Sequence, residues 1–250
     1  MNRRTWLGIQ SASLLTGLVG IVNLLSAVTP GTHSRIEWLR EIFPFEARAG
    51  GHLFSALSGF LLLTLAMTLL RRKRLAWMLV IALLIVSMIS HLIKGLDYEE
   101  CLLSGVLLVQ LLLMRNVFTA QSDRPSMVQG FRVLIGALLF TLAYGTLGFF
   151  LLDRQYSTPF SLSGALVQTL AMFFTADNAG LQPTGRFGRF FANSIYIVGA
   201  STLLYALWML LRPVIFRGGA GSAERQQAQA IVEQYGRSSL ARFTLLDDKS

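Results

Sequence analysis

Long apolar stretches, each close to the length needed to cross a bilayer, are the feature that most restricts the fold of this chain. A membrane-spanning α-helix needs about 20 apolar residues, and six stretches reach or approach that length. They are Trp6–Val28, Leu53–Leu70, Leu75–Ile93, Cys101–Phe118, Val133–Leu152 and Phe190–Leu211. Hydrophobic residues form 53% of the 250 residues and charged residues only 14%, which is unlike the composition of a soluble domain. The sequence therefore predicts an all-α integral membrane protein, a polytopic helical bundle of about six spans.

Basic residues lie between the apolar stretches and predict an orientation for them. The net charge is +9, and its placement follows the positive-inside rule, so nucleic-acid binding is not needed to explain it. The turn Arg71–Arg74 carries four cations and is expected in the cytoplasm together with Arg3 and Arg4. The loop Thr29–Gly51 and the turn Lys94–Glu100 then face outward.

A seventh apolar stretch, Phe160–Thr175, is shorter and more polar than the other six. If it spans, the bundle has seven helices and an extracellular tail. If it is re-entrant or interfacial, the bundle has six spans and a cytoplasmic tail. The distribution of Lys and Arg does not separate the two topologies, whereas the shortness and polarity of the stretch favour re-entrance. A re-entrant segment must be covered by protein at membrane depth.

The polar tail predicts a change of domain after the membrane region. We assign residues 1–217 to a transmembrane domain and residues 218–223, which are rich in glycine, to a hinge. Residues 224–250 are expected to begin a soluble α/β domain that is truncated here. Within them, the apolar spacing predicts an amphipathic helix over Glu224–Tyr235, which Gly236 would terminate, and the start of a strand after it.

Three acidic residues, Asp97, Glu99 and Glu100, lie between two apolar stretches. The second stretch needs residues back to about Cys101 to cross, so Glu99 and Glu100 are expected near the hydrocarbon edge. One interpretation is a polar site for a head group or an ion, because acidic groups at this depth are costly and often functional. The simpler interpretation is a solvated turn whose acids cap the next helix and interact with its dipole.

Four arginines, Arg186, Arg189, Arg212 and Arg217, flank the last apolar stretch and are candidates for lipid binding. A guanidinium group matches the geometry of a lipid phosphate, although arginines in such positions also serve as interfacial anchors. The two pairs lie at opposite ends of the stretch and cannot form one cluster. Asp177 lies in an irregular polar segment that either lines a substrate cavity or is an ordinary connecting loop.

No metal site, cofactor site or catalytic set is predicted within this chain. The single cysteine excludes a disulfide framework and a cysteine-based zinc cluster. His33, His52 and His91 are isolated from one another in the sequence, without the spacing of a metal-binding motif. No combination of nucleophile, base and orienting group can be assigned.

Three segments give the chain a resemblance to a known family: Gly95–Glu100, Gly185–Ser201 and Tyr235–Ser250. Over roughly Leu75–Ser250 the sequence resembles the bacterial phosphatidylglycerol lysyltransferases, the multiple peptide resistance factors. The last segment is the most specific, since it resembles the entry into the cytoplasmic acetyltransferase-like domain of that family. Because Met1 lies only a few residues before the first stretch, the chain resembles a short form without the extra spans implicated in flipping the product.

The resemblance implies a function for the full-length protein. Family members transfer an amino acid, typically lysine, from aminoacyl-tRNA to phosphatidylglycerol. The added amine lowers the negative charge of the membrane and hence its attraction for cationic antimicrobial peptides. The expected location is the bacterial inner membrane with both termini in the cytoplasm, which selects the re-entrant topology.

The residues that carry the chemistry of that family are expected beyond this chain. The expected partners are phosphatidylglycerol, aminoacyl-tRNA through the downstream domain, and the membrane; a homo-oligomer is left open. Two other functions also remain open. One is a lipid flippase or small-molecule transporter, and the other is a plain membrane anchor for a soluble domain.

Overall fold

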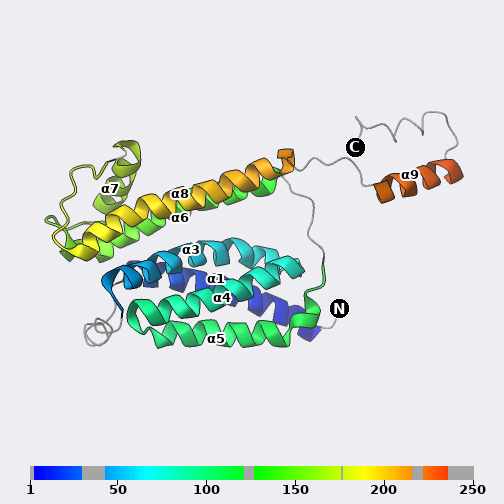
Figure 1. The fold of residues 1–250 in the computed structure, drawn as a ribbon, viewed down its shortest axis with the longest axis horizontal. Coiled ribbons are helices and arrows are strands. Elements are labelled where there is room, and N and C mark those ends of the chain that lie inside the picture. The colour runs from blue at the N-terminus through cyan, green and yellow to red at the C-terminus, as the bar shows by residue number, and fades with distance from the viewer. Residues whose placement is uncertain (1–2, 30–42, 121–126, 176, 216–221, 236–250) are drawn as a thin grey trace.

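The computed structural model describes residues 3–29, 43–120, 127–175, 177–215 and 222–235, which form an all-α structure (Figure 1). Its α-helices are α1 (Arg3–Val28), α3 (Phe45–Leu69), α4 (Arg74–Gly95), α5 (Tyr98–Leu113), α6 (Met127–Leu151), α7 (Leu162–Thr175), α8 (Arg186–Ile215) and α9 (Ser222–Tyr235). Two 3₁₀ turns, Arg115–Val117 and Asp153–Gln155, follow α5 and α6. The predicted all-α architecture is therefore confirmed for the described part of the chain.

Five of these helices are long and apolar enough to cross a bilayer: α1, α3, α4, α6 and α8. Many large apolar side chains on the helices point outward rather than into the core. Leu14, Leu113 and Leu204, for example, are 75%, 81% and 67% exposed. Such exposure is costly in water and is expected where lipid is the solvent.

The predicted span Cys101–Phe118 is shorter than expected. Helix α5 ends at Leu113 and has 16 residues, so it is about 24 Å long, less than the roughly 30 Å of a hydrocarbon core. The chain then turns through Arg115–Val117, and the ring of Phe118 is 1% exposed. Phe118 packs into the core beside the basic turn instead of continuing the helix.

The predicted outer loop Thr29–Gly51 is wrong at its C-terminal end, because α3 begins at Phe45. Pro44 precedes the helix with a φ of −61°, a position at which proline removes no helical hydrogen bond. Glu46 lies in the first turn, where the positive end of the helix dipole stabilises a carboxylate. Helix α3 therefore extends about two turns beyond its apolar stretch.

Helices α1, α3, α4 and α5 lie side by side and form one group (Figure 1). Helices α1 and α3 approach each other closely at Gly20 and Gly59. A Cβ atom built on Gly59 would lie 2.8 Å from the carbonyl oxygen of Gly20, so the two backbones meet where neither residue has a side chain. The core of this group includes Leu62, Leu84 and Leu107.

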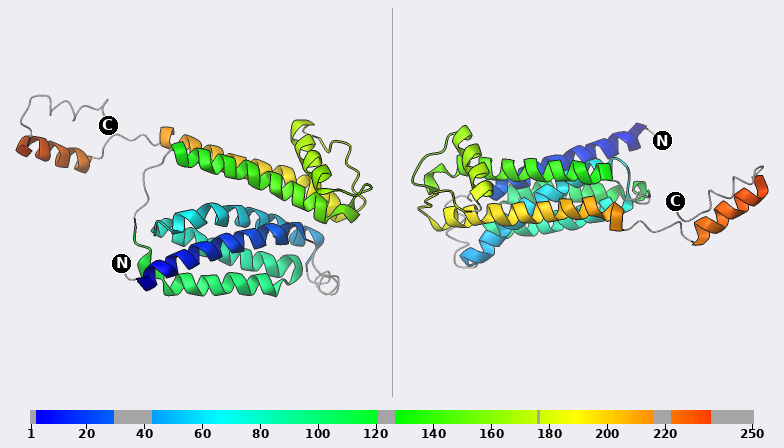
Figure 2. Two further views of the ribbon diagram at one scale, coloured as in Figure 1. Left: turned by 180° about the vertical axis from the view of Figure 1, so that it is seen from behind. Right: turned by 90° about the horizontal axis from the view of Figure 1, so that it is seen from above.

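Helices α6 and α8 form an antiparallel hairpin that packs against α3 (Figures 1 and 2). At one end of the hairpin, Gly130 lies against the backbone of Leu210. Phe60 of α3 joins the two groups: its ring centroid lies 5.2 Å from that of Phe140 and 5.9 Å from that of Tyr205. The hairpin thus shares one aromatic core with α3.

The segment that contains α7 leaves α6 and returns to α8 at the same end of the hairpin. Its two ends pair in an isolated antiparallel bridge between Tyr156 and Pro183, and the amide of Thr184 donates to the carbonyl of Gln155 at 2.8 Å. Between these ends, α7 packs along the hairpin: Phe173 lies 3.1 Å from the position of a Cβ on Gly199. Only Ala165, Thr169 and Met172 of α7 are buried, whereas Leu162, Val167 and Phe174 are 57%, 63% and 87% exposed, so α7 contacts the hairpin through one face. The choice between a re-entrant and a spanning segment stays a prediction.

The two ends of the bundle are called here the tail end and the far end. The tail end contains the Arg71–Arg74 turn, residues 115–120, the start of α6 and the end of α8, which leads to α9 (Figure 1). In this region the amide of Ala120 donates to the carbonyl of Arg72, and Arg72 Nε donates to the carbonyl of Val117 at 2.8 Å. The far end contains the end of α1, the start of α3, the turn after α4 and the start of α8.

Helix α9 confirms that a helix follows the membrane region, with Ser222–Tyr235 in place of the predicted Glu224–Tyr235. Ile231 and Tyr235, on its predicted apolar stripe, are 59% and 68% exposed. The hinge residues 218–221 and the predicted strand after Gly236 lie outside the described residues. The soluble α/β domain therefore stays a prediction.

Candidate functional site

A network of buried polar side chains joins α1, α3 and α4 toward the far end of the bundle. Asn23 is at its centre and is fully buried. Its Nδ2 donates to the hydroxyls of Ser58 at 3.0 Å and Ser87 at 2.7 Å. Its Oδ1 must then accept, so His91 Nε2, at 2.8 Å, is the donor of the third hydrogen bond. The side-chain amide of Asn23 therefore makes hydrogen bonds to polar groups on both α3 and α4, within an otherwise apolar bundle.

One helical turn further along α4 from His91, the side chain of Lys94 is buried in the same region. Lys94 is 1% exposed. Its ammonium donates to the carbonyl of Ser26 at 2.8 Å and to the hydroxyl of the same residue, and it lies 3.3 Å from Asp97 Oδ2. A buried ammonium is tolerated only when it is paired and hydrogen-bonded, and Lys94 meets both conditions.

The backbone after α4 places Asp97 over its own helix. Leu96 has a left-handed φ of 52°, and the amide of Asp97 donates back to the carbonyl of His91 at 3.1 Å. The chain thereby folds over Gly95, where a Cβ would lie 2.9 Å from Asp97 Oδ1. In the sequence Lys94–Asp97, the lysine provides the cation and the aspartate provides the carboxylate. The glycine between them leaves room for the carboxylate, and Leu96 makes the turn.

The three acids of this turn have different surroundings. Asp97 occupies the N-cap position of α5 but makes no side-chain capping bond, so capping is not what its carboxylate does. Glu100 Oε1 accepts a hydrogen bond from Ser26 at 3.4 Å, and its Oε2 is buried without a hydrogen-bond partner among the described residues. Glu99 is exposed. Asp97 and Glu100 face the polar network, whereas Glu99 is on the exposed side of the turn.

A basic pocket lies between the first turns of α3 and α8 at the far end. It has a volume of about 600 Å³ and is lined by Phe45, Glu46, Ala49, Gly50, Arg186, Arg189 and Phe190. The Arg186 guanidinium lies 5.2 Å from the ring centroid of Phe45 and 3.9 Å from Glu46 Oε1. The structure therefore brings Arg186 and Arg189 to one pocket, which opens to the surroundings through exposed side chains.

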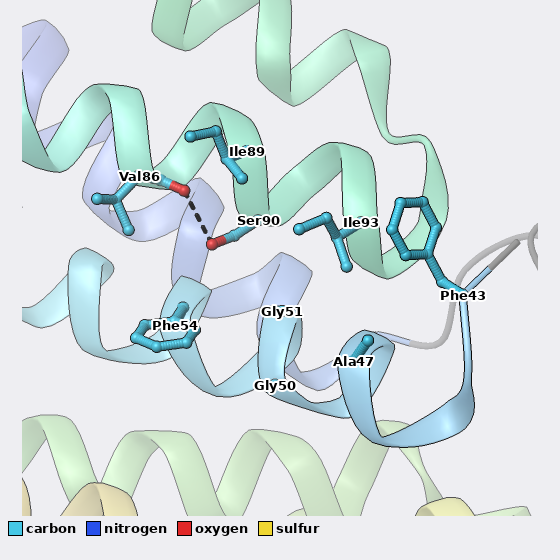
Figure 3. A pocket seen from close by; sticks show the side chains of 9 residues that line it. All are labelled: Phe43, Ala47, Gly50, Gly51, Phe54, Val86, Ile89, Ser90 and Ile93. Atoms are coloured by element: carbon cyan, nitrogen blue, oxygen red, sulfur yellow. Dashed lines mark hydrogen bonds between the residues drawn. The ribbon is translucent and has the colours of Figure 1, made fainter.

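An apolar groove of about 510 Å³ lies between α3 and α4, next to the basic pocket (Figure 3). Its lining residues are Phe43, Ala47, Gly50, Gly51, Phe54, Val86, Ile89, Ser90 and Ile93. The hydroxyl of Ser90 donates to the carbonyl of Val86 at 2.8 Å (Figure 3), so it offers the groove no free donor. Gly50 lines both the groove and the basic pocket.

The remaining predicted site residues lie elsewhere. Arg212 is in the last turn of α8 at the tail end, and Arg217 lies outside the described residues. The carboxylate of Asp177 accepts from the amide of Asn178 at 2.6 Å, and the Asp177 carbonyl accepts from Tyr196 at 2.8 Å. Asp177 thus stabilises the return from α7 and is not brought to Asp97 and Glu100.

Asn23, His91 and Lys94 were not predicted as site residues. A signal for them exists in the sequence, because His91, Lys94, Asp97 and Glu100 recur every three residues across the end of one apolar stretch. Asn23 and Ser26 repeat the same spacing on α1. Residues three apart on a helix share a face, so His91 and Lys94 lie on one face of α4. Asp97 and Glu100 continue the spacing through the turn into α5.

No family model matches the chain, and no curated protein matches it.

Proposed function

We propose that this chain is the membrane portion of an aminoacyl-phosphatidylglycerol synthase and that its far end carries a binding site for anionic phospholipid. The observation that carries the proposal is the basic pocket beside the apolar groove, with Gly50 common to both. An anionic phospholipid has these two requirements together: cationic donors for its phosphate and an apolar surface for an acyl chain. The segments Gly95–Glu100 and Gly185–Ser201, which carry the family resemblance, both begin at this end of the bundle.

The charge of the pocket suits a phosphate group. Arg186 and Arg189 lie one helical turn apart on α8, and both line the pocket. Glu46 opposes them with a single negative charge. Two guanidinium groups and one carboxylate leave a net positive charge, and guanidinium donors bind phosphate oxygens in pairs.

The path of α7 supports a cytoplasmic tail. Because Tyr156 pairs with Pro183, α7 adds no crossing between α6 and α8. The end of α8 and helix α9 then lie on the side of the Arg71–Arg74 turn, which the positive-inside rule assigns to the cytoplasm. A downstream domain on that side would meet aminoacyl-tRNA.

A second function, movement of the lipid between leaflets, is favoured by the position of the basic pocket. Arg186 and Arg212 are 26 residues apart on one helix, which corresponds to about 39 Å. The pocket is therefore at the leaflet opposite the tail, whereas an acyl transfer in the cytoplasm needs lipid in the inner leaflet. A lipid translocase would use cationic sites at both ends of α8.

Binding of phosphatidylglycerol to the purified chain tests the lipid site. We expect native mass spectrometry in detergent to show tighter binding of phosphatidylglycerol than of phosphatidylcholine. The double variant Arg186→Gln, Arg189→Gln should weaken binding at least tenfold, because it removes both phosphate donors. Arg154→Gln, an exposed far-end arginine that does not line the pocket, is the matched control. Equal binding of the two lipids, or an unchanged double variant, would contradict the lipid site.

The synthase itself is tested by the gene and by topology. An acetyltransferase-like domain encoded after Ser250, with lysyl-phosphatidylglycerol formed in cells that carry the gene, supports the proposal. A stop codon directly after Ser250, or a C-terminal tag that is accessible from outside the cell, contradicts it. Lipid aminoacylation by residues 1–250 alone would contradict the proposed position of the catalytic domain.

A further inference from the structure

We infer that His91, Asp97 and Glu100 form a binding site for a divalent transition-metal ion at the far end of the bundle. One ligand atom from each of the three residues lies within 4.8 Å of the other two. The three side chains come from the last turns of α4, from the turn after it and from the first turn of α5. A cation bound to all three would fasten α5 to α4.

The ring of His91 is fully buried and is prepared as a ligand. Its Nε2 donates to Asn23 Oδ1, so in the neutral ring the lone pair is on Nδ1. That Nδ1 is buried and has no hydrogen-bond partner among the described residues. Histidine ligands of metals are held in this way, with the second ring nitrogen donating to a neighbouring oxygen. The metal would therefore bind at Nδ1.

Glu100 provides a second buried acceptor atom that has no hydrogen-bond partner in the described part of the chain. Its Oε2 is buried and unpartnered among the residues that the structure describes, while Oε1 is held by Ser26. A buried carboxylate oxygen without a donor is unfavourable unless a cation is close to it. Two of the three residues of the cluster, His91 and Glu100, thus each carry a buried acceptor atom without a partner among the described residues, and they lie on neighbouring helices.

The ligand types select the class of metal. One imidazole nitrogen and two carboxylates are ligands of Zn²⁺ and Mn²⁺, whereas Mg²⁺ and Ca²⁺ prefer oxygen ligands alone. Three protein ligands leave at least one coordination position for water or another ligand.

The charges of the cluster also favour a cation. Asp97 and Glu100 carry two negative charges when ionised, and Lys94 balances one of them at 3.3 Å from Asp97 Oδ2. One negative charge remains in a largely buried region, where a charge is weakly screened. Lys94 competes with a metal for Asp97, so removing its charge should strengthen metal binding.

Metal binding to the full chain, purified in detergent without a histidine tag and treated with EDTA, tests this inference. We expect isothermal titration with Zn²⁺ or Mn²⁺ to give one ion per chain, with at least tenfold weaker binding of Mg²⁺ and Ca²⁺. With Co²⁺ as the probe, the visible absorption spectrum should report a nitrogen ligand that His91→Gln removes.

The neighbouring acids provide a matched pair of variants. Glu100→Gln, which keeps the shape of the side chain, should weaken Zn²⁺ binding at least tenfold, whereas Glu99→Gln should change it less than twofold. Lys94→Met should strengthen it. Thermal melting without metal identifies variants that fold. No binding by the wild type, equal binding by folded Glu100→Gln, or Mg²⁺ binding as tight as Zn²⁺ binding would overturn the inference.

Discussion

The ammonium of Lys94 lies 3.3 Å from the carboxylate of Asp97, three residues further along the chain, and both are turned into the bundle. The left-handed Leu96 and the missing side chain of Gly95 make this contact possible. A helix end in a membrane protein is commonly finished by solvent or head groups. At the end of α4, the polar groups are instead held by the internal ion pair of Lys94 and Asp97. This ion pair fixes the direction in which α5 leaves α4.

The first prediction concerns this pair. Asp97→Asn should lower the free energy of unfolding by about 3 kcal/mol, because it leaves the ammonium of Lys94 buried with one partner fewer. The double variant Asp97→Asn, Lys94→Met should be less destabilised than Asp97→Asn alone. Unfolding in mixed detergent and SDS micelles measures both values. If the stability lost in the double variant equals the sum of the losses in Asp97→Asn and Lys94→Met, the two residues are not coupled.

Two adjacent glycines of α3 should respond in opposite ways to alanine. A Cβ on Gly50 meets no atom within 4 Å, so Gly50→Ala should stabilise the helix by about 0.5–1 kcal/mol. A Cβ on Gly51 would lie 2.9 Å from Lys94 Cβ and 3.0 Å from the carbonyl of Ser90. Gly51→Ala should therefore destabilise by about 1–3 kcal/mol. Thermal melting of both variants in one detergent is the measurement, and equal shifts would disprove the close α3–α4 contact.

Replacing Asn23 should loosen three helices at once. Asn23→Leu removes hydrogen bonds to Ser58, Ser87 and His91. At about 0.6 kcal/mol for each membrane-buried hydrogen bond, the loss is about 2 kcal/mol. Gln110→Leu is the control. Among the described residues, the Gln110 amide makes one hydrogen bond, to the hydroxyl of Ser11 at 2.8 Å, so this variant should cost about a third as much. A loss for Asn23→Leu no larger than that of the control would contradict the network.

Alkaline pH should loosen the segment around α7. Burial, and then the nearby Tyr144, raise the pKa of Tyr156 above the value near 10 of an exposed tyrosine. The folded protein thus keeps a proton that the unfolded chain releases, so this contribution is complete below pH 10 and is lost as the pH rises above it.

Tyr156→Phe provides the test of that pH dependence. The variant loses the hydrogen bond from Tyr156 to the carbonyl of Gly188, worth about 1 kcal/mol at neutral pH. Melting temperatures between pH 8 and 12 should then fall less steeply in Tyr156→Phe than in the wild type. Parallel curves would show that Tyr156 does not titrate differently on folding.

The sequence by itself determined that this protein is a helical membrane protein and where most of its helices lie. Apolar runs of this length can satisfy their backbone in a bilayer only as helices, so five of the six predicted spans appear as long helices. The predicted span Cys101–Phe118 was too long, because α5 ends at Leu113. Hydropathy alone does not show that Phe118 packs into the core beside the basic turn. The start of α3 was also missed, since helix caps and propensities act beyond the apolar run.

Only the tertiary structure decided which polar residues meet. Asn23 and Ser26 are distant in the sequence from His91 and Lys94, and the packing of α1 and α4 against α3 brings them together. It also separated residues that the sequence had grouped: Glu99 from Glu100, and Asp177 from both. The hydropathy of a segment is a local property and can be read from that segment alone. The pairing of buried charges depends instead on which helices are in contact, and the sequence of one segment does not specify its neighbours.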